Sequence, residues 1–142
     1  MTAQEIFDIA TKSVLFHLAT VEGDQPRVRE MMLYKADENG IVFHTSALKD
    51  LCKQVKSNPK VELCFNYESM QVRIFGELEE ILDTKFKDEI TEHPSRKFLK
   101  AWKESGELED FYKNFTVYSL KNGVASVWTK ETNFVPKEYI QL

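Results

Sequence analysis

The chain has 142 residues, of which 42% are hydrophobic and 30% are charged, a composition typical of a globular domain that buries one core. Its net charge of −4 argues against a general nucleic-acid-binding protein, because contacts to phosphates require a basic surface. No apolar run approaches the roughly 20 residues that span a bilayer, and the N-terminal stretch lacks the basic and apolar parts of an export signal, so we expect a cytoplasmic protein that does not bind membranes.

The first half of the chain predicts one helix and then strands. Residues 3–12 carry apolar side chains at helical spacing, and Thr2 and Glu5 are placed to form a capping box at their start. Strands are predicted over three segments: 14–21, 27–35 and 41–45. A polar turn joins the last two, which we therefore expect to form a β-hairpin. Alternation places five side chains on one face of strand 27–35: Arg27, Arg29, Met31, Leu33 and Lys35.

A helix with regularly spaced lysines follows this hairpin. Its apolar stripe comprises Leu48, Leu51, Cys52 and Val55, and its cations are Lys49, Lys53 and Lys56. Lys49 falls in the first turn, beside the unpaired N–H groups and the positive end of the helix dipole. A bound anion would make this placement favourable, because such a helix end is a natural phosphate site. The alternative is that Lys49 and Lys53 are solvated surface lysines.

Two neighbouring features favour the phosphate site. Arg27 and Arg29 share one face of the adjacent strand, and Thr45 and Ser46 place hydroxyl groups at the junction between strand and helix. Taken singly, an arginine pair on a solvent face and hydroxyl groups that cap a helix are both common. Their convergence with the lysines predicts a single site for one phosphate.

The second half of the chain returns to strands on either side of a helical segment. Strands are predicted over 60–67 and 71–81, and Gly76 indicates a bulge or a close approach by another group. Residues 83–113 have helical spacing, and their part 83–105 is expected to form a lid packed on the barrel or, alternatively, a surface for a partner helix. The last strands, "TVYSL" and "VASVW", flank Asn122-Gly123 and predict a hairpin with a type I′ turn.

Six or so strands without alternating βαβ units predict an antiparallel barrel or sandwich with peripheral helices. No repeat, low-complexity tract or linker interrupts the sequence, so we expect one domain over residues 1–142.

At this point a resemblance to a known family can be stated. The chain resembles the pyridoxamine-phosphate-oxidase-like flavoproteins over "LATVEGDQPRVREMMLYKADENGIVFHTSALKDLCKQVKSNPKVELCF", with the ordered elements "AT…G.QP..R", "G..F.T", "K…KQ" and "NP.VEL". The short bacterial branches, of general-stress and nitroimidazole-reductase type, are the most similar. The resemblance implies a mainly β fold with α-helices: a six-stranded antiparallel split β-barrel of Greek-key topology. It also implies FMN as the cofactor, bound between the subunits of a homodimer.

The resemblance assigns ten residues to the cofactor site: Arg27, Arg29, Met31, His44, Thr45, Ser46, Lys49, Lys53, Gln54 and Trp128. Arg29 occupies the family's arginine position and Lys49 its phosphate-contacting lysine position, while Lys53 and Gln54 match its "KQ" pair. Trp128 falls where C-terminal aromatic residues often cover the flavin. The alternatives are that Met31 is a core residue and Trp128 a packing residue.

The function implied is that of an oxidoreductase that moves electrons or hydride between a reduced nicotinamide and a small acceptor, although no catalytic residue is identified. The alternatives are a non-catalytic flavin-binding protein of the stress response, and a member of the fold that binds haem or a deazaflavin. We do not expect a true pyridoxamine-phosphate oxidase, because the chain is short and lacks that enzyme's C-terminal arginine cluster.

The sequence gives little support for a metal site or a redox-active cysteine pair. The three histidines, His17, His44 and His93, show no metal-ligand spacing, so we expect no metal site. Cys52 and Cys64 form no C-x-x-C motif and are expected to be reduced thiols.

Overall fold

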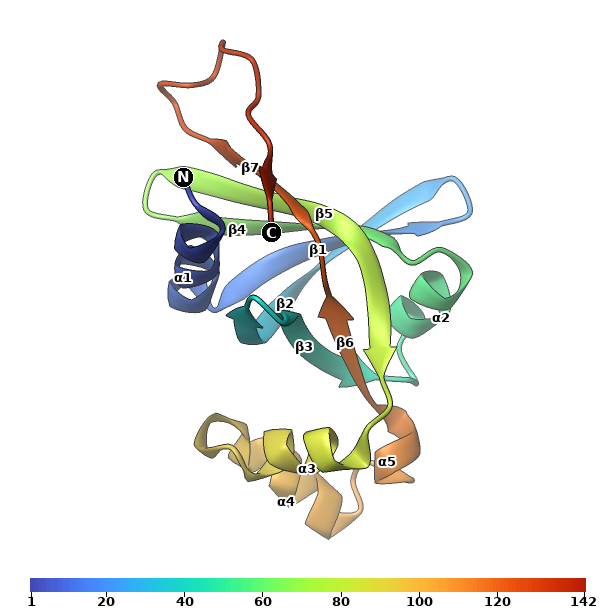
Figure 1. Cartoon of the computed structure of the whole chain (residues 1–142). Coiled ribbons are helices and arrows are strands. Elements are labelled where there is room, and N and C mark those ends of the chain that lie inside the picture. Colours follow the sequence, from blue (N-terminus) through green and yellow to red (C-terminus); the bar gives the residue numbers. More distant parts are fainter.

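Six antiparallel strands close into a barrel in this computed structural model, which describes residues 1–142 (Figure 1). The strands are β1 (Leu15–Glu22), β2 (Gln25–Asp37), β3 (Gly40–Ser46), β4 (Lys60–Tyr67), β5 (Met70–Ile81) and β6 (Phe115–Leu120). Their order around the barrel is β1, β2, β3, β6, β5, β4, and pairing of β4 with both β1 and β5 closes it. The neighbouring order β4, β1, β2, β3 is a Greek key. The predicted six-stranded Greek-key barrel is therefore confirmed.

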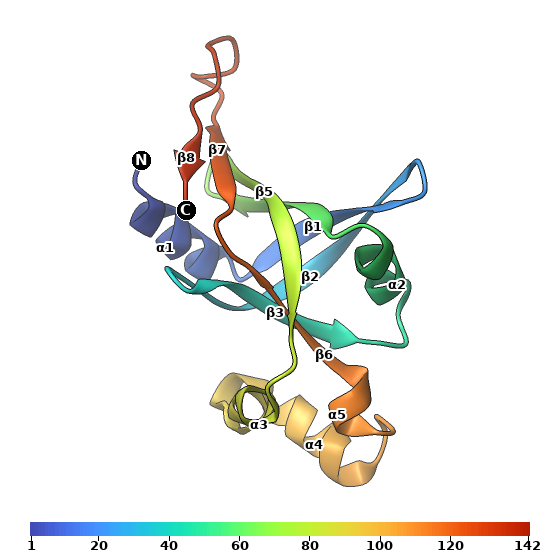
Figure 2. The ribbon, with the colours of Figure 1, turned by 45° about the vertical axis from the view of Figure 1, so that its right-hand side comes forward.

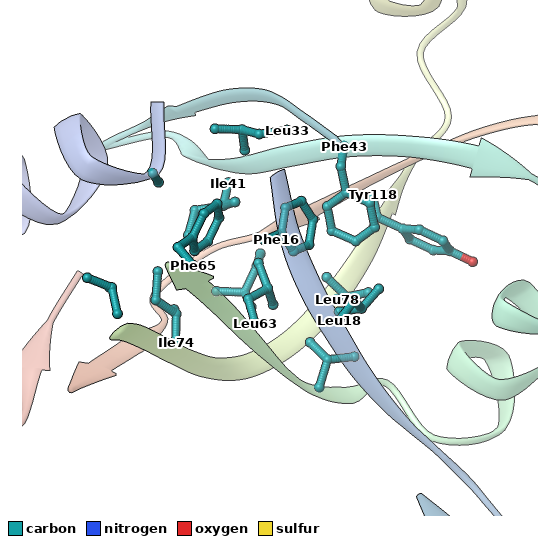
Figure 3. Packing of buried hydrophobic residues seen from close by; sticks show 14 of the residues in the cluster. Phe16, Leu18, Leu33, Ile41, Phe43, Leu63, Phe65, Ile74, Leu78 and Tyr118 are labelled. Carbon is teal, nitrogen blue, oxygen red and sulfur yellow. The ribbon is translucent and has the colours of Figure 1, made fainter. Parts of the chain in front are cut away.

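Aromatic side chains fill the barrel because alternate residues of each strand point inward. The ring of Phe16 lies 5.3 Å from that of Phe43 and 5.0 Å from that of Phe65, and all three side chains are fully buried (Figure 3). Two helices contribute apolar side chains to the same core: α1 (Ala3–Ser13) and α2 (Asp50–Ser57).

Helix α1 begins where the sequence predicts. The backbone N–H of Thr2 donates to the Glu5 carboxylate (2.7 Å), and the N–H of Glu5 donates to Oγ1 of Thr2 (3.2 Å), which confirms the capping box. Ile6 and Ala10 of this helix are fully buried in the barrel core.

The hairpin of β2 and β3 contains a bulge that the sequence does not signal. Leu33 lies opposite Phe43, but Lys35 lies opposite Val42, so Tyr34 is an additional residue on β2. Beyond the bulge, the inward-facing and outward-facing positions of β2 are exchanged. Ala36 therefore packs on the core, and Lys35 is exposed. The prediction that Lys35 shares a face with Leu33 is therefore wrong.

The predicted hairpin around Asn122-Gly123 is also wrong. Strand β7 (Val124–Trp128) pairs with β5 and with the short β8 (Ile140–Gln141), while β6 pairs with β3 and β5. A type I′ turn requires a positive φ at both central residues, and only Asn122 has one (54°). The chain instead shifts sideways here and continues along β5 (Figure 2).

The role of Gly76 is close packing. Strand β5 pairs with β4 through this residue without a register shift, and a Cβ atom there would lie 3.3 Å from Leu120 Cδ2. Of the two alternatives stated above, the close approach is therefore the one observed.

Residues 83–114 form a helical layer against the barrel, below it in Figure 1. Its elements are α3 (Thr84–Glu92), the 3₁₀ turn Pro94–Arg96, α4 (Lys97–Ser105) and α5 (Phe111–Asn114). A second apolar cluster joins this layer to the outward-facing side chains of β3 and β6: Val42, Ile90, Leu99, Phe111, Phe115 and Val117. This segment packs on the strands, as one of the two interpretations expected. None of the helices is long and apolar enough to cross a membrane.

Candidate functional site

Helix α2 starts one residue later than its lysine spacing suggests. Lys49 is the N-cap residue, with an extended backbone and no side-chain capping bond. Leu48 precedes the helix in a turn and is 71% exposed, so its predicted place in the buried stripe is wrong. The polar Gln54 is only 5% exposed and takes its place beside Leu51 and Val55 on the buried face of α2.

A cavity of about 580 Å³ lies between β2, the end of β3 and the first turns of α2. Six of the ten predicted residues line it: Arg27, Arg29, Met31, Thr45, Lys49 and Gln54. Residues separated by up to 27 positions in the chain, from Arg27 to Gln54, thus meet at one place. Three carboxylates also line the cavity: Glu22, Glu30 and Asp50.

Arg29 is held in place by neutral oxygen atoms. Its Nη1 donates to Oγ1 of Thr20 (2.6 Å) and to the carbonyl of Leu18 (3.3 Å), and its Nη2 donates to Oε1 of Gln54 (2.6 Å). A guanidinium group has five N–H donors, so two remain for a ligand. Burial lowers the pKa of Arg29, but a guanidinium group keeps its charge in proteins.

Arg27 differs, because a carboxylate already neutralises it. Its Nη2 contacts Oε1 of Glu22 at 3.0 Å, and Gln54 Nε2 donates to the other oxygen of Glu22 at 3.1 Å. Hydrogen bonds from Arg27 and Gln54 lower the pKa of Glu22. Of the three cations that line the cavity, Arg29 and Lys49 therefore make no ion pair.

Thr45 provides an independent sign of a ligand. Its Oγ1 lies buried at the end of β3 and has no hydrogen-bond partner, and Thr45 is one of the residues that line the cavity. A buried hydroxyl without a partner is uncommon and costs free energy, which a ligand oxygen would recover. Two unpaired cations and one unpartnered hydroxyl are a donor set that fits a phosphate dianion.

Four predicted residues lie outside this cavity: His44, Ser46, Lys53 and Trp128. His44 points to the opposite side of β3 from Thr45, where its Nε2 accepts a hydrogen bond from Nε of Arg96 (2.8 Å). Burial, and then the charges of Arg96 and Lys49, lower the pKa of His44 to about 4, so the imidazole is neutral near pH 7. Ser46 Oγ accepts from the backbone N–H of Leu48 (3.2 Å).

Lys53 and Trp128 line two other cavities. Lys53 faces a cavity of about 560 Å³ on the far side of α2. Trp128 lies on β7 beside a cavity of about 370 Å³, and its Nε1 donates to Oδ1 of Asn133 (2.8 Å). The structure does not bring these two residues to Arg29 within one chain.

Thr20 and Glu22 belong to the site but were not predicted. Thr20 is 1% exposed, and its hydroxyl donates to Gln54 Oε1 (2.6 Å) while accepting from Arg29. The sequence contained one signal: Thr20 continues the inward alternation of Phe16 and Leu18 and is the polar residue in it. A polar side chain at a buried strand position needs a partner, and here the partner is the site.

Comparison with known proteins identifies relatives of the chain in sequence and in fold. A family model described as pyridoxamine 5'-phosphate oxidase matches residues 2–121. The pyridoxine/pyridoxamine 5'-phosphate oxidase of Brucella anthropi is 30% identical over 118 residues, which cover 78% of this chain and 58% of that protein. The chain thus spans less than two thirds of the length of the curated relatives that it matches first.

Two solved structures share the fold. A NimC/NimA family protein of Clostridium acetobutylicum is 24% identical with a TM-score of 0.75, over 99% of this chain and 93% of that one. A pyridoxamine 5'-phosphate oxidase-related, FMN-binding protein of Nostoc punctiforme is 18% identical with a TM-score of 0.66, over 96% and 84%. Because the family model extends over most of the sequence, from β1 through β6, this chain belongs to the pyridoxamine 5'-phosphate oxidase family.

Proposed function

We propose that the chain binds FMN with its phosphate in the Arg29 cavity and acts as an oxidoreductase between a reduced nicotinamide and a small acceptor. The observation that carries the first part is the meeting of two unpaired cations, Arg29 and Lys49, with the unpartnered hydroxyl of Thr45. When bound, FMN supplies the redox chemistry, and the protein supplies its orientation and surroundings.

Arg29 and Lys49 contribute to FMN binding in different ways. Arg29 offers two N–H groups whose direction is fixed by its three other hydrogen bonds. Lys49 adds an exposed positive charge at the N-terminus of α2, where no side-chain capping bond is present. Charge-assisted hydrogen bonds contribute roughly 1.5–3 kcal/mol each, whereas micromolar binding requires about 8 kcal/mol. The flavin ring must therefore also bury apolar surface.

We propose that a second copy of the chain covers the flavin ring. Val28 lines the cavity and is 68% exposed on the outer face of the sheet. The register places Val28 on the same face as Phe75, through Ala19 and Glu62, and Phe75 is exposed as well. Val28 and Phe75 are thus two exposed apolar side chains on one face, with the Glu62 carboxylate between them, and exposed apolar side chains beside a cavity support an interface there. We therefore propose a homodimer with FMN between its subunits.

Spectroscopy of the purified protein tests the cofactor. We expect the absorption bands of an oxidised flavin, and mass analysis of the released ligand should identify FMN. Sedimentation should show a dimer, and a monomer that retains tightly bound FMN would contradict the interface. Oxidation of reduced nicotinamide is then measured with quinones, nitro compounds or oxygen as acceptor, and pyridoxamine 5'-phosphate is tested as a substrate in parallel.

One observation favours a non-catalytic flavin-binding protein as the second candidate. No histidine, cysteine or tyrosine lines the cavity, so proton transfer there would depend on its carboxylates, Glu22, Glu30 and Asp50, or on Lys49. The general stress protein 26 of Bacillus anthracis has the same fold, with a TM-score of 0.66. Absence of acceptor-dependent oxidation in an FMN-loaded protein would favour this candidate.

Haem is a weaker candidate for this cavity. A haem-binding protein of Mycobacterium smegmatis shares the fold, with a TM-score of 0.62 at 15% identity. Haem iron is usually held by histidine, cysteine, tyrosine or methionine, and of these only Met31 lines the cavity. His44 is unsuitable, because Arg96 occupies its Nε2. The spectrum also separates FMN from haem and from a deazaflavin.

A further inference from the structure

The second cavity, on the far side of α2, has the features of a separate binding site. Its volume is about 560 Å³, within the range of small-molecule pockets. Val55 of α2 and Leu78 of β5 form apolar walls, and both are buried. The mouth carries two lysines of α2, Lys53 and Lys56, which make no ion pair, and one carboxylate, Glu80. The net charge of the side chains that line this cavity is therefore +1.

Tyr118 gives this cavity a buried polar group. The residue is 4% exposed and lines the cavity, and its hydroxyl points away from the labelled apolar side chains of the core (Figure 3). Its polar neighbour is the thiol of Cys52, which itself donates to the carbonyl of Ser46 (3.3 Å). Burial, then contact with Cys52, raises the pKa of Tyr118, so the phenol remains a hydrogen-bond donor.

We propose that this cavity binds a small apolar monoanion, such as an aromatic carboxylate. The ring lies between Val55 and Leu78, Lys53 and Lys56 attract the carboxylate, and the hydroxyl of Tyr118 supplies a hydrogen bond. A neutral apolar ligand would leave the two lysines unused.

Helix α2 separates this cavity from the Arg29 cavity, so the two sites share a wall. Leu51 and Gln54 face the Arg29 cavity, and Val55 faces the second one. Thr45 and Thr116 lie opposite each other on β3 and β6, and each lines one of the two cavities. A ligand that moves α2 must therefore alter both sites.

The test is a titration of ¹⁵N-labelled protein, as purified, with 1-naphthoate. We expect saturable shifts of the amide signals of Cys52, Val55 and Thr116, with those of Thr20 and Arg29 changing less. The neutral 1-naphthamide should bind about tenfold more weakly, because it lacks the charge that Lys53 and Lys56 attract. Equal affinity of the acid and the amide would overturn the proposal.

Three variants locate the site. Lys53→Gln combined with Lys56→Gln should weaken naphthoate about tenfold, whereas Lys85→Gln on α3 removes a charge elsewhere and should not. Tyr118→Phe should weaken naphthoate but not naphthamide. Ala47→Trp fills the cavity from its partly exposed rim and should abolish binding of both while the protein remains folded. Unchanged binding in folded Ala47→Trp, or one-for-one displacement of naphthoate by inorganic phosphate, would place the ligand elsewhere and overturn the proposal.

Discussion

Arg29 on β2 and Gln54 on α2 are joined by a hydrogen bond of 2.6 Å between Nη2 and Oε1. The same Gln54 oxygen accepts from Thr20, and its amide nitrogen donates to Glu22, so one buried amide connects two strands to the helix. This network fixes the direction of a cation without neutralising it, because every acceptor of Arg29 is an uncharged oxygen. An arginine that is oriented but not neutralised remains available to an anion.

Gln54→Glu tests whether the uncharged acceptor matters. The carboxylate keeps a hydrogen bond to Arg29 but neutralises it and adds a negative charge near the phosphate. We expect FMN affinity to fall at least about tenfold while the protein stays folded. Fluorescence titration with FMN measures the affinity, and thermal unfolding monitors the fold. Gln4→Glu, on the exposed face of α1, is the control for charge alone. Unchanged affinity in Gln54→Glu would mean that Arg29 does not bind the phosphate.

Lys49→Glu tests the second cation. The substitution replaces attraction of a phosphate dianion by repulsion at the start of α2, and we expect FMN affinity to fall roughly 100-fold. Lys85→Glu makes the same charge change in the first turn of α3 and should leave the affinity unchanged. Lys53→Glu tests whether Lys53 also contacts FMN. The sequence predicts weaker FMN binding, whereas the position of Lys53 in the cavity on the far side of α2 predicts a small effect.

Thr45→Val tests the unpartnered hydroxyl by separating binding from stability. Valine keeps the shape of the side chain and removes an oxygen that has no partner in the free protein. We therefore expect the free energy of unfolding to stay constant or rise slightly, and FMN to bind roughly tenfold more weakly. Thr116→Val, at the opposite position on β6, loses a hydrogen bond to the Asn114 carbonyl and should cost about 1 kcal/mol of stability without weakening FMN. A loss of stability in Thr45→Val would give that hydroxyl a structural role instead.

Local patterns predicted most of the barrel, because they act over a few residues. The alternation of β1 and the capping box of α1 are both set by neighbours within four positions. The bulge at Tyr34 and the path through Asn122-Gly123 depend on contacts between distant strands. A Cβ atom at Gly123 would lie 2.5 Å from Leu120 Cδ2 and 3.0 Å from Ile74 Cγ2, so this glycine accommodates packing rather than a hairpin turn.

The candidate site was predicted in part for the same reason. Arg27, Arg29 and Met31 share a face because strand geometry requires it, and they line the cavity. Helical spacing was applied to Lys49 and Lys53 as though both belonged to α2, but the extended backbone of Lys49 turns its side chain to a different cavity. The direction of the His44 side chain follows from strand alternation. Because its neighbour Thr45 faces the cavity, His44 faces the helical layer.

The contact between His44 and Arg96 predicts a loss of stability in mild acid. Arg96 Nε donates to the lone pair of His44 Nε2, and Arg96 Nη2 donates to the carbonyl of Leu33 (2.8 Å), so this arginine fastens the helical layer to the barrel. Burial lowers the pKa of His44 to about 4, and the positive charges of Arg96 and Lys49 act in the same direction. In the unfolded chain the same imidazole titrates near its ordinary value of 6.5.

Between these two values the unfolded state binds a proton that the folded state does not, so the free energy of unfolding falls as the pH falls from 6.5 toward 4. From pH 7 to pH 5 the expected loss is about 2 kcal/mol. Urea unfolding at a series of pH values measures it, with His44→Gln as the variant that keeps an acceptor for Arg96 but does not titrate. His17→Gln, an exposed histidine on β1, is the matched control and should retain the wild-type slope. Parallel pH profiles for wild type and His44→Gln would show that His44 is not the group responsible.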